Sequence, residues 1–534
     1  MMEERDDRHA DHDPPASRLP GWLTETPYWA ISAVAHVILV LFIGGIVLLQ
    51  TEDKRPEVRT VVRAEFKPQP YDPRADRDVI KKPVITETER EQPIVKHKPN
   101  EIQAEIPNGV DENKLTNKNL EAEAINDAFA IGGGGDASAY GNRSGRGSLS
   151  REGGNKATEA AVLAALHWLR RHQHPDGHWS GADFRHQCDD PSKPCAMADE
   201  GYSDGRGFAD HDVGLTGLAM LAFLGYAHTH RDGEVREFRT VMKRAMDWML
   251  AQQVMKDGEN PDHVGRYGPT TAEEWMYSHA IATMAMGELL FLSQDRLKLR
   301  RSVEAATHFC MASQNEGFGW KYKYKGGTND TSVTGWMVLA LKTSKSCAAL
   351  RLVNTDKEKF TQHFDWALAW FARSTAKISG RTGYEAPGDA GSKLLTGYPE
   401  PYPFSKEPSC MTAVALLCRL FAGENHRSDD IKKGVSVLAQ EPPTWARQRG
   451  KQMSKINMYY WYYATYAMFQ YGGQAWKDWN LAMQAALLPN QRRLGCEDGS
   501  WDPVGEWGLA GGRVYATAIN AMTLEVYYRF QRTQ

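Results

Sequence analysis

Six stretches of the chain are apolar or small at nearly every position, which is typical of helices buried on all sides. They span residues 213–226, 277–292, 331–341, 411–421, 458–469 and 514–527. Between them lie amphipathic stretches with a helical period, such as 165–173 and 306–314, which predict helices with one exposed face. Six buried helices alternating with six half-exposed ones fit two concentric rings. The pattern therefore predicts an all-α fold, an (α/α)6 toroid.

The amphipathic stretches end in a repeated motif, in which Gln is followed by a short turn and Gly-x-aromatic. Clear copies run from Gln173 to Trp179, from Gln314 to Trp320 and from Gln491 to Trp501. Degenerate copies end at Tyr267, Tyr384 and Trp445. Successive copies lie roughly 50 to 80 residues apart, a spacing that indicates one supersecondary unit repeated around a common core.

These Gln-x-x-x-Gly-x-Trp ends resemble the QW repeats of squalene-hopene cyclases and the related repeats of protein prenyltransferase β subunits, over about residues 158–529. The segments 330–336 and 511–517 look like the membrane-tethered prenyltransferase/squalene-oxidase-repeat proteins of bacteria. The resemblance implies a terpenoid cyclase-like toroid. It implies no activity, because repeats that join outer helices say nothing about the chemistry of a central cavity.

The residues that carry the chemistry of these families are only partly present. Cyclases of this family protonate an alkene with the central acid of an Asp-x-Asp-Asp-Thr motif, and Asn329 stands at that position in the stretch 328–331. Prenyltransferases bind zinc through Asp, Cys and a distant His; Asp330 and Ser332 match the spacing, but the thiolate is replaced by a hydroxyl. We therefore expect a domain that binds a hydrophobic or glycan ligand without either standard chemistry.

An enzyme remains the alternative, either of the terpene cyclase/mutase-like class or a polysaccharide lyase that uses His and Tyr. Polar residues near the starts of buried helices supply its candidate catalytic groups: His279, Asp212, Asp330 and Tyr277. Such a His with a neighbouring Tyr could serve as base and acid, while the two Asp residues orient them. The competing interpretation is structural, since an Asp before an apolar helix is most often its N-cap.

Aromatic residues provide the candidate ligand-binding surface. The densest run is 459–463, and a helix would direct about two of these five side chains into the cavity. We take Trp336, Tyr460, Trp461 and Tyr515 as the candidate ligand-binding residues. Aromatic rings suit an isoprenoid or a sugar equally, and packing within the core is the competing interpretation.

The seven cysteines suggest neither a disulfide scaffold nor a zinc ribbon. Cys188 and Cys195 flank a short polar loop and could close a small disulfide in an exported domain. A metal site made of His186, both thiolates and either His174 or His211 matches no standard zinc spacing. The sequence thus predicts no bound metal and no cofactor.

One segment near the N-terminus departs from this pattern. Residues 29–49 carry no formal charge and are long enough to cross a bilayer as a helix. Residues 51–155 are rich in Pro, mixed charge and Gly, which is typical of a disordered tether. The predicted order is a polar tail (1–27), a transmembrane helix (28–50), the linker (51–155) and the toroid (156–534).

Composition and charge set limits on partners and location. The chain of 534 residues has 41% hydrophobic and 25% charged residues, which excludes a polytopic membrane protein and a mostly disordered chain. The net charge of −3 provides no large basic field, so we expect no nucleic-acid partner. By the positive-inside count alone, the toroid would be cytoplasmic. The short tail, the apolar helix and the Pro-containing linker resemble the anchors of TonB-type envelope proteins, and this likeness favours a single-pass inner-membrane protein with an extracytoplasmic toroid. The sequence identifies no protein partner.

Overall fold

The computed structural model describes residues 152–188, 194–195, 205–257, 260–387, 389, 409–446, 456–505 and 507–530. The chain divides into two compact units, Met1–Val95 and Lys96–Gln534, and all described residues belong to the second. The expected tail, transmembrane helix and nearly all of the linker lie outside the described residues. Within the described ranges, no helix has the length and apolar character needed to cross a bilayer.

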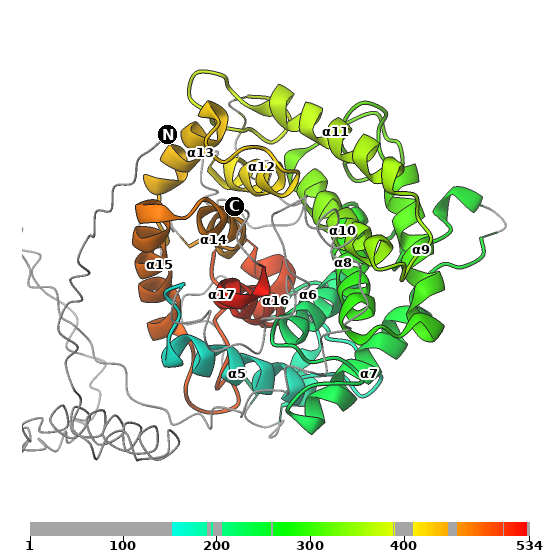
Figure 1. Cartoon of the computed structure of the whole chain (residues 1–534). Helices are drawn as coiled ribbons and strands as arrows, with labels where there is room; N and C mark the ends of the chain where they lie inside the picture. Colours follow the sequence, from blue (N-terminus) through cyan, green and yellow to red (C-terminus); the bar gives the residue numbers. More distant parts are fainter. Residues whose placement is uncertain are drawn as a thin grey trace, which may run out of the picture. The chain divides into compact units, whose positions relative to one another are not determined.

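Helices and isolated bridges make up all regular structure in the described part of the chain, as the all-α prediction requires. Six helices form a closed inner ring, in which each contacts the next and the last contacts the first (Figure 1). They are α6 (Asp212–Gly225), α8 (Trp275–Ser293), α10 (Thr331–Ala349), α12 (Ser409–Phe421), α14 (Met458–Tyr471) and α16 (Gly508–Leu524). Each corresponds to one of the six predicted buried stretches.

A second set of helices surrounds this ring, and each packs on one or two inner helices (Figure 1); the first, α5, packs mainly on the last inner helix, α16. These are α5 (Lys156–Arg171), α7 (Arg236–Ala251), α9 (Arg296–Ala312), α11 (Lys357–Ser374), α13 (Asp429–Ala439) and α15 (Gly473–Leu487). Short helices complete the described part: η2 (Phe184–Gln187), η3 (Ala209–His211), η4 (Pro261–His263), η5 (Leu488–Asn490) and α17 (Val526–Arg529). The described unit is thus a double ring, and the predicted alternation of inner and outer helices is confirmed.

Helix α10 is longer than the apolar stretch predicted, because polar residues continue it in a buried setting. Thr343 and Ser346 donate their hydroxyl protons to the carbonyl oxygens of Leu339 (3.1 Å) and Lys342 (3.2 Å), four residues back. Ser344 accepts a hydrogen bond from Thr307 on α9 (2.8 Å). Hydroxyls that are satisfied in this way can be buried at little cost, so the helix continues past the apolar run.

In four of the six repeats, the Gln joins one outer helix to the next. Its side-chain Nε2 donates twice: to a carbonyl in its own Gly-x-aromatic turn and to a carbonyl of another outer helix. The second acceptors are Val241 on α7 for Gln173, Ser302 on α9 for Gln253, His363 on α11 for Gln314 and Ala161 on α5 for Gln491. The bond from Gln491 (2.8 Å) joins the end of the chain to its first outer helix and so closes the outer ring.

The aromatic residue of the repeat joins the turn to the inner ring. The backbone N–H of Trp179 donates to Thr216 Oγ1 on α6 (3.0 Å), and the same bond joins Trp320 to Thr334 on α10 (3.1 Å). The indole N–H of Trp179 donates to the carbonyl of Leu169 (2.7 Å). The repeat therefore fixes each turn to two rings at once, and these inner-helix threonines were not anticipated from the sequence.

The glycine of the motif is required by close backbone approach. Gly177 has φ of +115°, and a Cβ there would lie 2.3 Å from the carbonyl oxygen of Arg244. Gly499 has φ of +90°, and a Cβ would lie 2.1 Å from the carbonyl oxygen of Ala164. Only glycine fits both the left-handed conformation and the contact.

A buried ion group fastens the C-terminal helix α17 to the inner ring. Arg529 donates to both carboxylate oxygens of Glu288 on α8 (3.1 and 3.0 Å) and to Glu525 (2.8 Å). It also donates to the carbonyl of Leu221 on α6 (2.8 Å), and all three charged side chains are fully buried.

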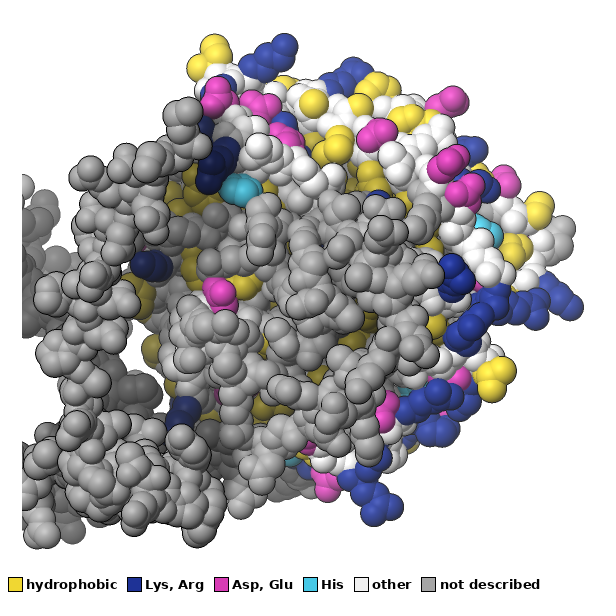
Figure 2. All heavy atoms as spheres, in the orientation of Figure 1, with side chains coloured by type: hydrophobic (Ala, Val, Ile, Leu, Met, Phe, Trp, Pro, Cys, Tyr) yellow, Lys and Arg dark blue, Asp and Glu magenta, His cyan; other side chains and the backbone are white. Residues whose placement is uncertain are grey.

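The outer surface of the described unit differs from this buried group, since acidic and basic side chains are interspersed around its rim (Figure 2).

Candidate functional site

Asp330 has an environment that its capping role does not fully explain. It is the N-cap of α10, and its Oδ1 accepts a hydrogen bond from the backbone N–H of Val333 (2.7 Å). The residue is fully buried, yet its Oδ2 has no hydrogen-bond partner among the residues that the structure describes. A buried carboxyl oxygen without a partner is rare in folded proteins, and it points to a missing ligand, a water or a reactive role.

Burial raises the pKa of the Asp330 carboxyl from 3.8 to about 7. Its bond to the backbone of Val333 and the charge of Lys321 act in the opposite direction without cancelling this effect. The carboxyl is therefore present in both protonation states near neutral pH. It can either accept a hydrogen bond or donate a proton at Oδ2.

Phenols surround this carboxyl and extend from it toward the surface. Tyr322 and Tyr384 are joined through their hydroxyls, and the ring of Tyr277 lies 6.3 Å from that of Tyr322. Tyr384 is buried, whereas Tyr277 and Tyr322 are partly exposed. Burial raises the pKa of all three phenols, so they remain neutral at physiological pH. They can relay hydrogen bonds but cannot act as phenolate bases.

A second aromatic group is formed by α10 and α14, and one of its members, Tyr459, interacts electrostatically with Asp330. Trp336 stacks on Tyr462, with ring centroids 5.8 Å apart, and contacts Tyr463 edge-on at 5.5 Å. The hydroxyls of Tyr459 and Ser332 share a hydrogen bond of 2.8 Å, and Ser332 lies two residues after Asp330 in the sequence. The ring of Tyr459 also contacts Trp507, whose buried indole nitrogen has no partner among the described residues. We call Asp330, Ser332, Trp336, Tyr459 and Trp507 the Asp330 site.

His279, the predicted base, lies apart from this site. Its Nδ1 accepts a hydrogen bond from the backbone N–H of Tyr267 (3.1 Å), and its Nε2 lies 3.3 Å from Cys310 Sγ on the outer helix α9. Burial lowers its pKa to about 3. Tyr277 precedes it by two residues on α8, which places the two side chains about 200° apart around the helix. The structure brings Tyr277, but not His279, to Asp330.

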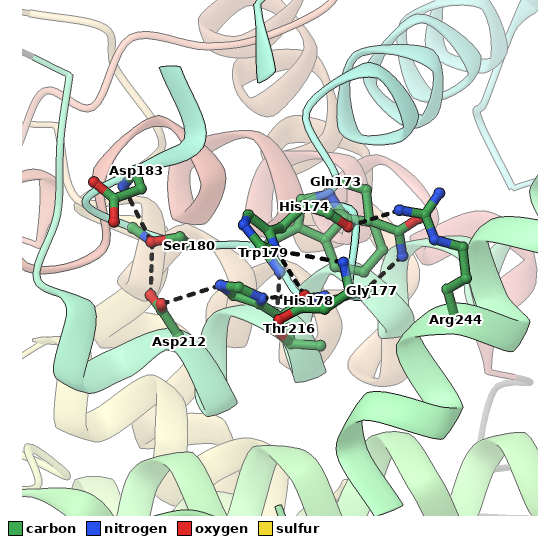
Figure 3. A network of polar contacts seen from close by, with 12 residues as sticks. Gln173, His174, Gly177, His178, Trp179, Ser180, Asp183, Asp212, Thr216 and Arg244 are labelled. Atoms are coloured by element: carbon green, nitrogen blue, oxygen red, sulfur yellow. Dashed lines mark hydrogen bonds and ion pairs between the residues drawn. The ribbon is translucent and has the colours of Figure 1, made fainter. Parts of the chain in front are cut away.

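Asp212, the other candidate acid, serves the first repeat (Figure 3). It is the first residue of α6, and its Oδ1 accepts the backbone N–H of Gly181 (2.8 Å) rather than capping its own helix. Its Oδ2 lies 3.5 Å from Nε2 of His178, whose Nδ1 lies 2.5 Å from Asp176. Burial alone would lower the pKa of His178, but the two carboxylates raise it above 6.5. Asp212 thus orders the turn that contains His178.

Two of the predicted ligand-binding aromatics lie on other faces of their helix. Tyr460 donates its hydroxyl proton to the carbonyl of Glu441 (3.0 Å) and contacts Trp479 on the outer helix α15. Trp461 packs against Trp445 at 6.0 Å. Tyr515 is half-buried on α16 and packs against the core. Of the four predicted residues, the structure places Trp336 in the Asp330 site.

The cysteine pair belongs to a group of side chains that its spacing in the sequence does not predict. Cys188 and Cys195 are free thiols in the structure, so the disulfide considered from the sequence is not formed there. Their sulfur atoms lie 3.5 and 3.3 Å from Nε2 of His172. The sulfur atom of Cys496 lies 3.3 Å from the same nitrogen. Cys496 is more than 300 positions away in sequence, so no local spacing could reveal this group.

Tyr322, Tyr384 and Tyr459 also went unrecognised as neighbours of Asp330. A signal for the first two exists in the sequence, because each follows the glycine of a repeat turn, Gly319 and Gly383, by one to three residues. Such turns lead into inner helices. Their aromatic residues therefore gather where inner helices begin.

No protein-family model matches the chain, and no curated protein matches it. Solved structures that are similar to it include the apo form of the type II terpene cyclase MstE from Scytonema, with 10% sequence identity and a TM-score of 0.40. That match covers 69% of this chain and 97% of the MstE chain. An inactive variant of the α-1,6-mannanase GH76A of Salegentibacter has 9% identity and a TM-score of 0.41, covering 70% and 99%. A mutant of Rex8A from Paenibacillus barcinonensis has 8% identity and a TM-score of 0.43, covering 72% and 97%.

Proposed function

We propose that the toroid binds an uncharged amphipathic lipid, with the apolar part against the aromatic rings of the Asp330 site and a terminal hydroxyl bonded to Asp330 Oδ2. The unpartnered, fully buried Oδ2 carries this proposal. A ligand hydroxyl would supply the missing bond, and the indole N–H of Trp507 offers a donor to a ligand oxygen.

The surroundings of Asp330 favour a lipid over a glycan. Sugars need several polar groups to replace the water they lose, but the hydroxyls of Ser332 and Tyr459 are already bonded to each other, which leaves Asp330 Oδ2 and the indole N–H of Trp507 for a ligand. The raised pKa of Asp330 indicates surroundings poor in water, in which an uncharged hydroxyl is a better partner than a polar saccharide.

A double-mutant cycle tests this proposal. The full chain and its Asp330→Asn variant are titrated with geranylgeraniol and with its methyl ether, which lacks the hydroxyl proton. Asn preserves the N-cap but replaces Oδ2 with a donor. We expect the variant to bind the alcohol about tenfold to a hundredfold more weakly, which corresponds to a hydrogen bond to a charged or strongly polar partner. It should bind the ether as the unchanged chain does.

Equal losses for both ligands would contradict the contact between hydroxyl and carboxyl. Asp356→Asn, at the exposed N-cap of α11, controls for the replacement of a capping carboxylate. Xylotriose serves as the glycan probe, and binding of xylotriose with no binding of the alcohol would reverse the choice of ligand.

Acid-catalysed chemistry is a second candidate function, because a carboxyl with a pKa near 7 can protonate an alkene-bearing ligand. The Oδ2–H bond breaks as a C–H bond forms on an alkene carbon, and the resulting cation returns a proton from a neighbouring carbon to the carboxylate. Incubation of the full chain with geranylgeraniol in D2O would then place deuterium on carbon in the recovered lipid. Asp330→Asn should abolish this incorporation. A lipid recovered without deuterium would restrict the domain to binding.

The attachment to the inner membrane through residues 28–50, with an extracytoplasmic toroid, remains part of the proposal. Trypsin added to intact spheroplasts should cleave the Lys- and Arg-containing linker (51–155) and release the toroid. Cleavage seen only after lysis would place the toroid in the cytoplasm instead.

A further inference from the structure

Four potential metal ligands from three separate segments converge at one point. They are His172 at the end of α5, Cys188 and Cys195 between η2 and α6, and Cys496 between η5 and α16. Their ligand atoms all lie within 4.8 Å of one another. The group differs in chemistry from the Asp330 site, because it consists of one imidazole and three thiols and has no carboxylate or hydroxyl.

The tautomer of His172 is fixed by its second nitrogen. Nδ1 lies 2.9 Å from the carbonyl oxygen of Trp168, which can only accept, so Nδ1 carries the proton. Nε2 is then the unprotonated nitrogen, and it is the atom that faces all three sulfurs. Histidines that bind metals commonly show this arrangement, with the other ring N–H donated to a backbone carbonyl.

The distances match a tetrahedral site. Zinc bonds of about 2.3 Å to sulfur and about 2.0 Å to nitrogen, meeting at the tetrahedral angle, place the nitrogen about 3.5 Å from each sulfur. The observed distances from His172 Nε2 are 3.5 Å to Cys188, 3.3 Å to Cys195 and 3.3 Å to Cys496. One nitrogen lone pair can accept from one thiol at a time, so hydrogen bonding alone does not explain why three sulfurs face it.

The surroundings also suit a structural metal. His172, Cys188 and Cys195 are buried, and the ring of Trp168 stacks on that of His172 at 4.2 Å. The backbone N–H of Cys195 points to Cys188 Sγ at 3.3 Å, a bond that stabilises a thiolate. Cys496 is only half-buried, which leaves a route for the ion.

We propose that His172, Cys188, Cys195 and Cys496 bind one structural Zn²⁺. Binding replaces the three thiol protons: three S–H bonds break, three Zn–S bonds and one Zn–N bond form, and three protons go to solvent. With four protein ligands the coordination shell is closed, so the site contributes stability and not catalysis. It joins the first outer helix to the last repeat turn, across 324 positions between His172 and Cys496.

The test is the metal content of the full chain, purified without chelator and measured by inductively coupled plasma mass spectrometry. We expect about one zinc per chain, as a single four-ligand site requires. Cys496→Ala removes one of the four ligands and should lower the zinc affinity by more than about tenfold, because loss of outer-shell partners alone commonly costs that much. The zinc content retained through purification should fall with it. Cys418→Ala, which removes a buried thiol on α12, is the matched control and should leave the content unchanged.

Cobalt provides the second readout. After zinc is removed from the unchanged chain, Co²⁺ should produce thiolate-to-metal charge-transfer absorption and the intense visible bands of a tetrahedral site. If Cys496→Ala does not fold, Cys496→His retains four ligands and should bind Co²⁺ with weaker charge transfer. Absence of both zinc and a thiolate–cobalt spectrum would overturn the proposal, as would a Cys188–Cys195 disulfide in non-reduced peptides of the purified chain.

Discussion

Two buried aspartates that both cap helices show how local contacts decide the behaviour of a residue. Asp295 caps α9, and its carboxylate also contacts His230 (3.0 Å) and Arg231 (2.8 Å). Burial raises its pKa, but these partners lower it on balance. Asp330 caps α10 without such a partner, and burial raises its pKa to about 7. The capping role is the same, but only Asp330 retains an oxygen for a ligand.

The raised pKa of Asp330 predicts a pH-dependent stability. The folded chain holds this proton more tightly than the unfolded chain does, so the contribution of Asp330 to stability falls as the pH rises from about 4 to about 7. Asp330→Asn removes the titration. Its free energy of unfolding relative to the unchanged chain should increase over that range by up to about 4 kcal/mol, at about 1.4 kcal/mol per pKa unit. Urea unfolding at a series of pH values measures the difference, and parallel curves would contradict it.

Which face of a helix a residue occupies was predictable only in part. The aromatic run 459–463 indicates a buried helix, but it does not give the rotation of that helix, and each residue turns the side chain by about 100°. The inner face therefore includes Tyr459, Tyr462 and Tyr463, while Tyr460 and Trp461 face elsewhere. Rotation is set by partners distant in sequence, which no local pattern contains.

At the scale of helices, the repeat makes a prediction about Gln491. Its side chain donates to two carbonyls, of Ala161 and Gly499, at 2.8 Å each. Gln491→Ala leaves both buried acceptors without this donor, at about 1–3 kcal/mol each. We expect the free energy of unfolding to fall by about 2–4 kcal/mol, as measured by urea titration. Gln474→Ala on α15 removes an exposed side chain bonded to Asp478, and an equal loss there would contradict a special role for Gln491.

The existence and order of the helices were predictable because they depend on local periodicity. Inner stretches are apolar on every face and outer ones on one face, and this difference alone separates the two rings. The groupings around Asp330 and around His172 were not predictable, because each joins turns from different repeats. Cys496, for example, reads in sequence as a lone loop cysteine.

For the whole molecule, the ring depends on contacts between its first and last segments. Gln491 bonds to α5, and Arg529 bonds to Glu288 on α8 and to the carbonyl of Leu221 on α6. The proposed zinc site would add a further link between α5 and the turn that contains Cys496. Closure therefore relies on several kinds of bond in different layers of the double ring.

The ion group around Arg529 allows a prediction at this scale. Arg529→Met retains much of the side-chain volume but leaves Glu288 and Glu525 buried without their counter-charge. Breaking a buried ion pair from one side typically costs about 3–5 kcal/mol, and we expect a loss of this size in urea unfolding. Arg493→Met, at an exposed arginine, should change the stability by less than about 0.5 kcal/mol. Equal effects of the two variants would contradict the assigned role of Arg529.

Infrared difference spectroscopy tests the central claim, a bond between a bound lipid and Asp330, most directly. At a pH below about 7, the unchanged full chain should show the C=O stretch of a protonated carboxylic acid that is missing in Asp330→Asn. Addition of geranylgeraniol should shift this band, because the ligand hydroxyl becomes a partner of the carboxyl. Binding of the alcohol that leaves the Asp330 band unshifted would contradict the account.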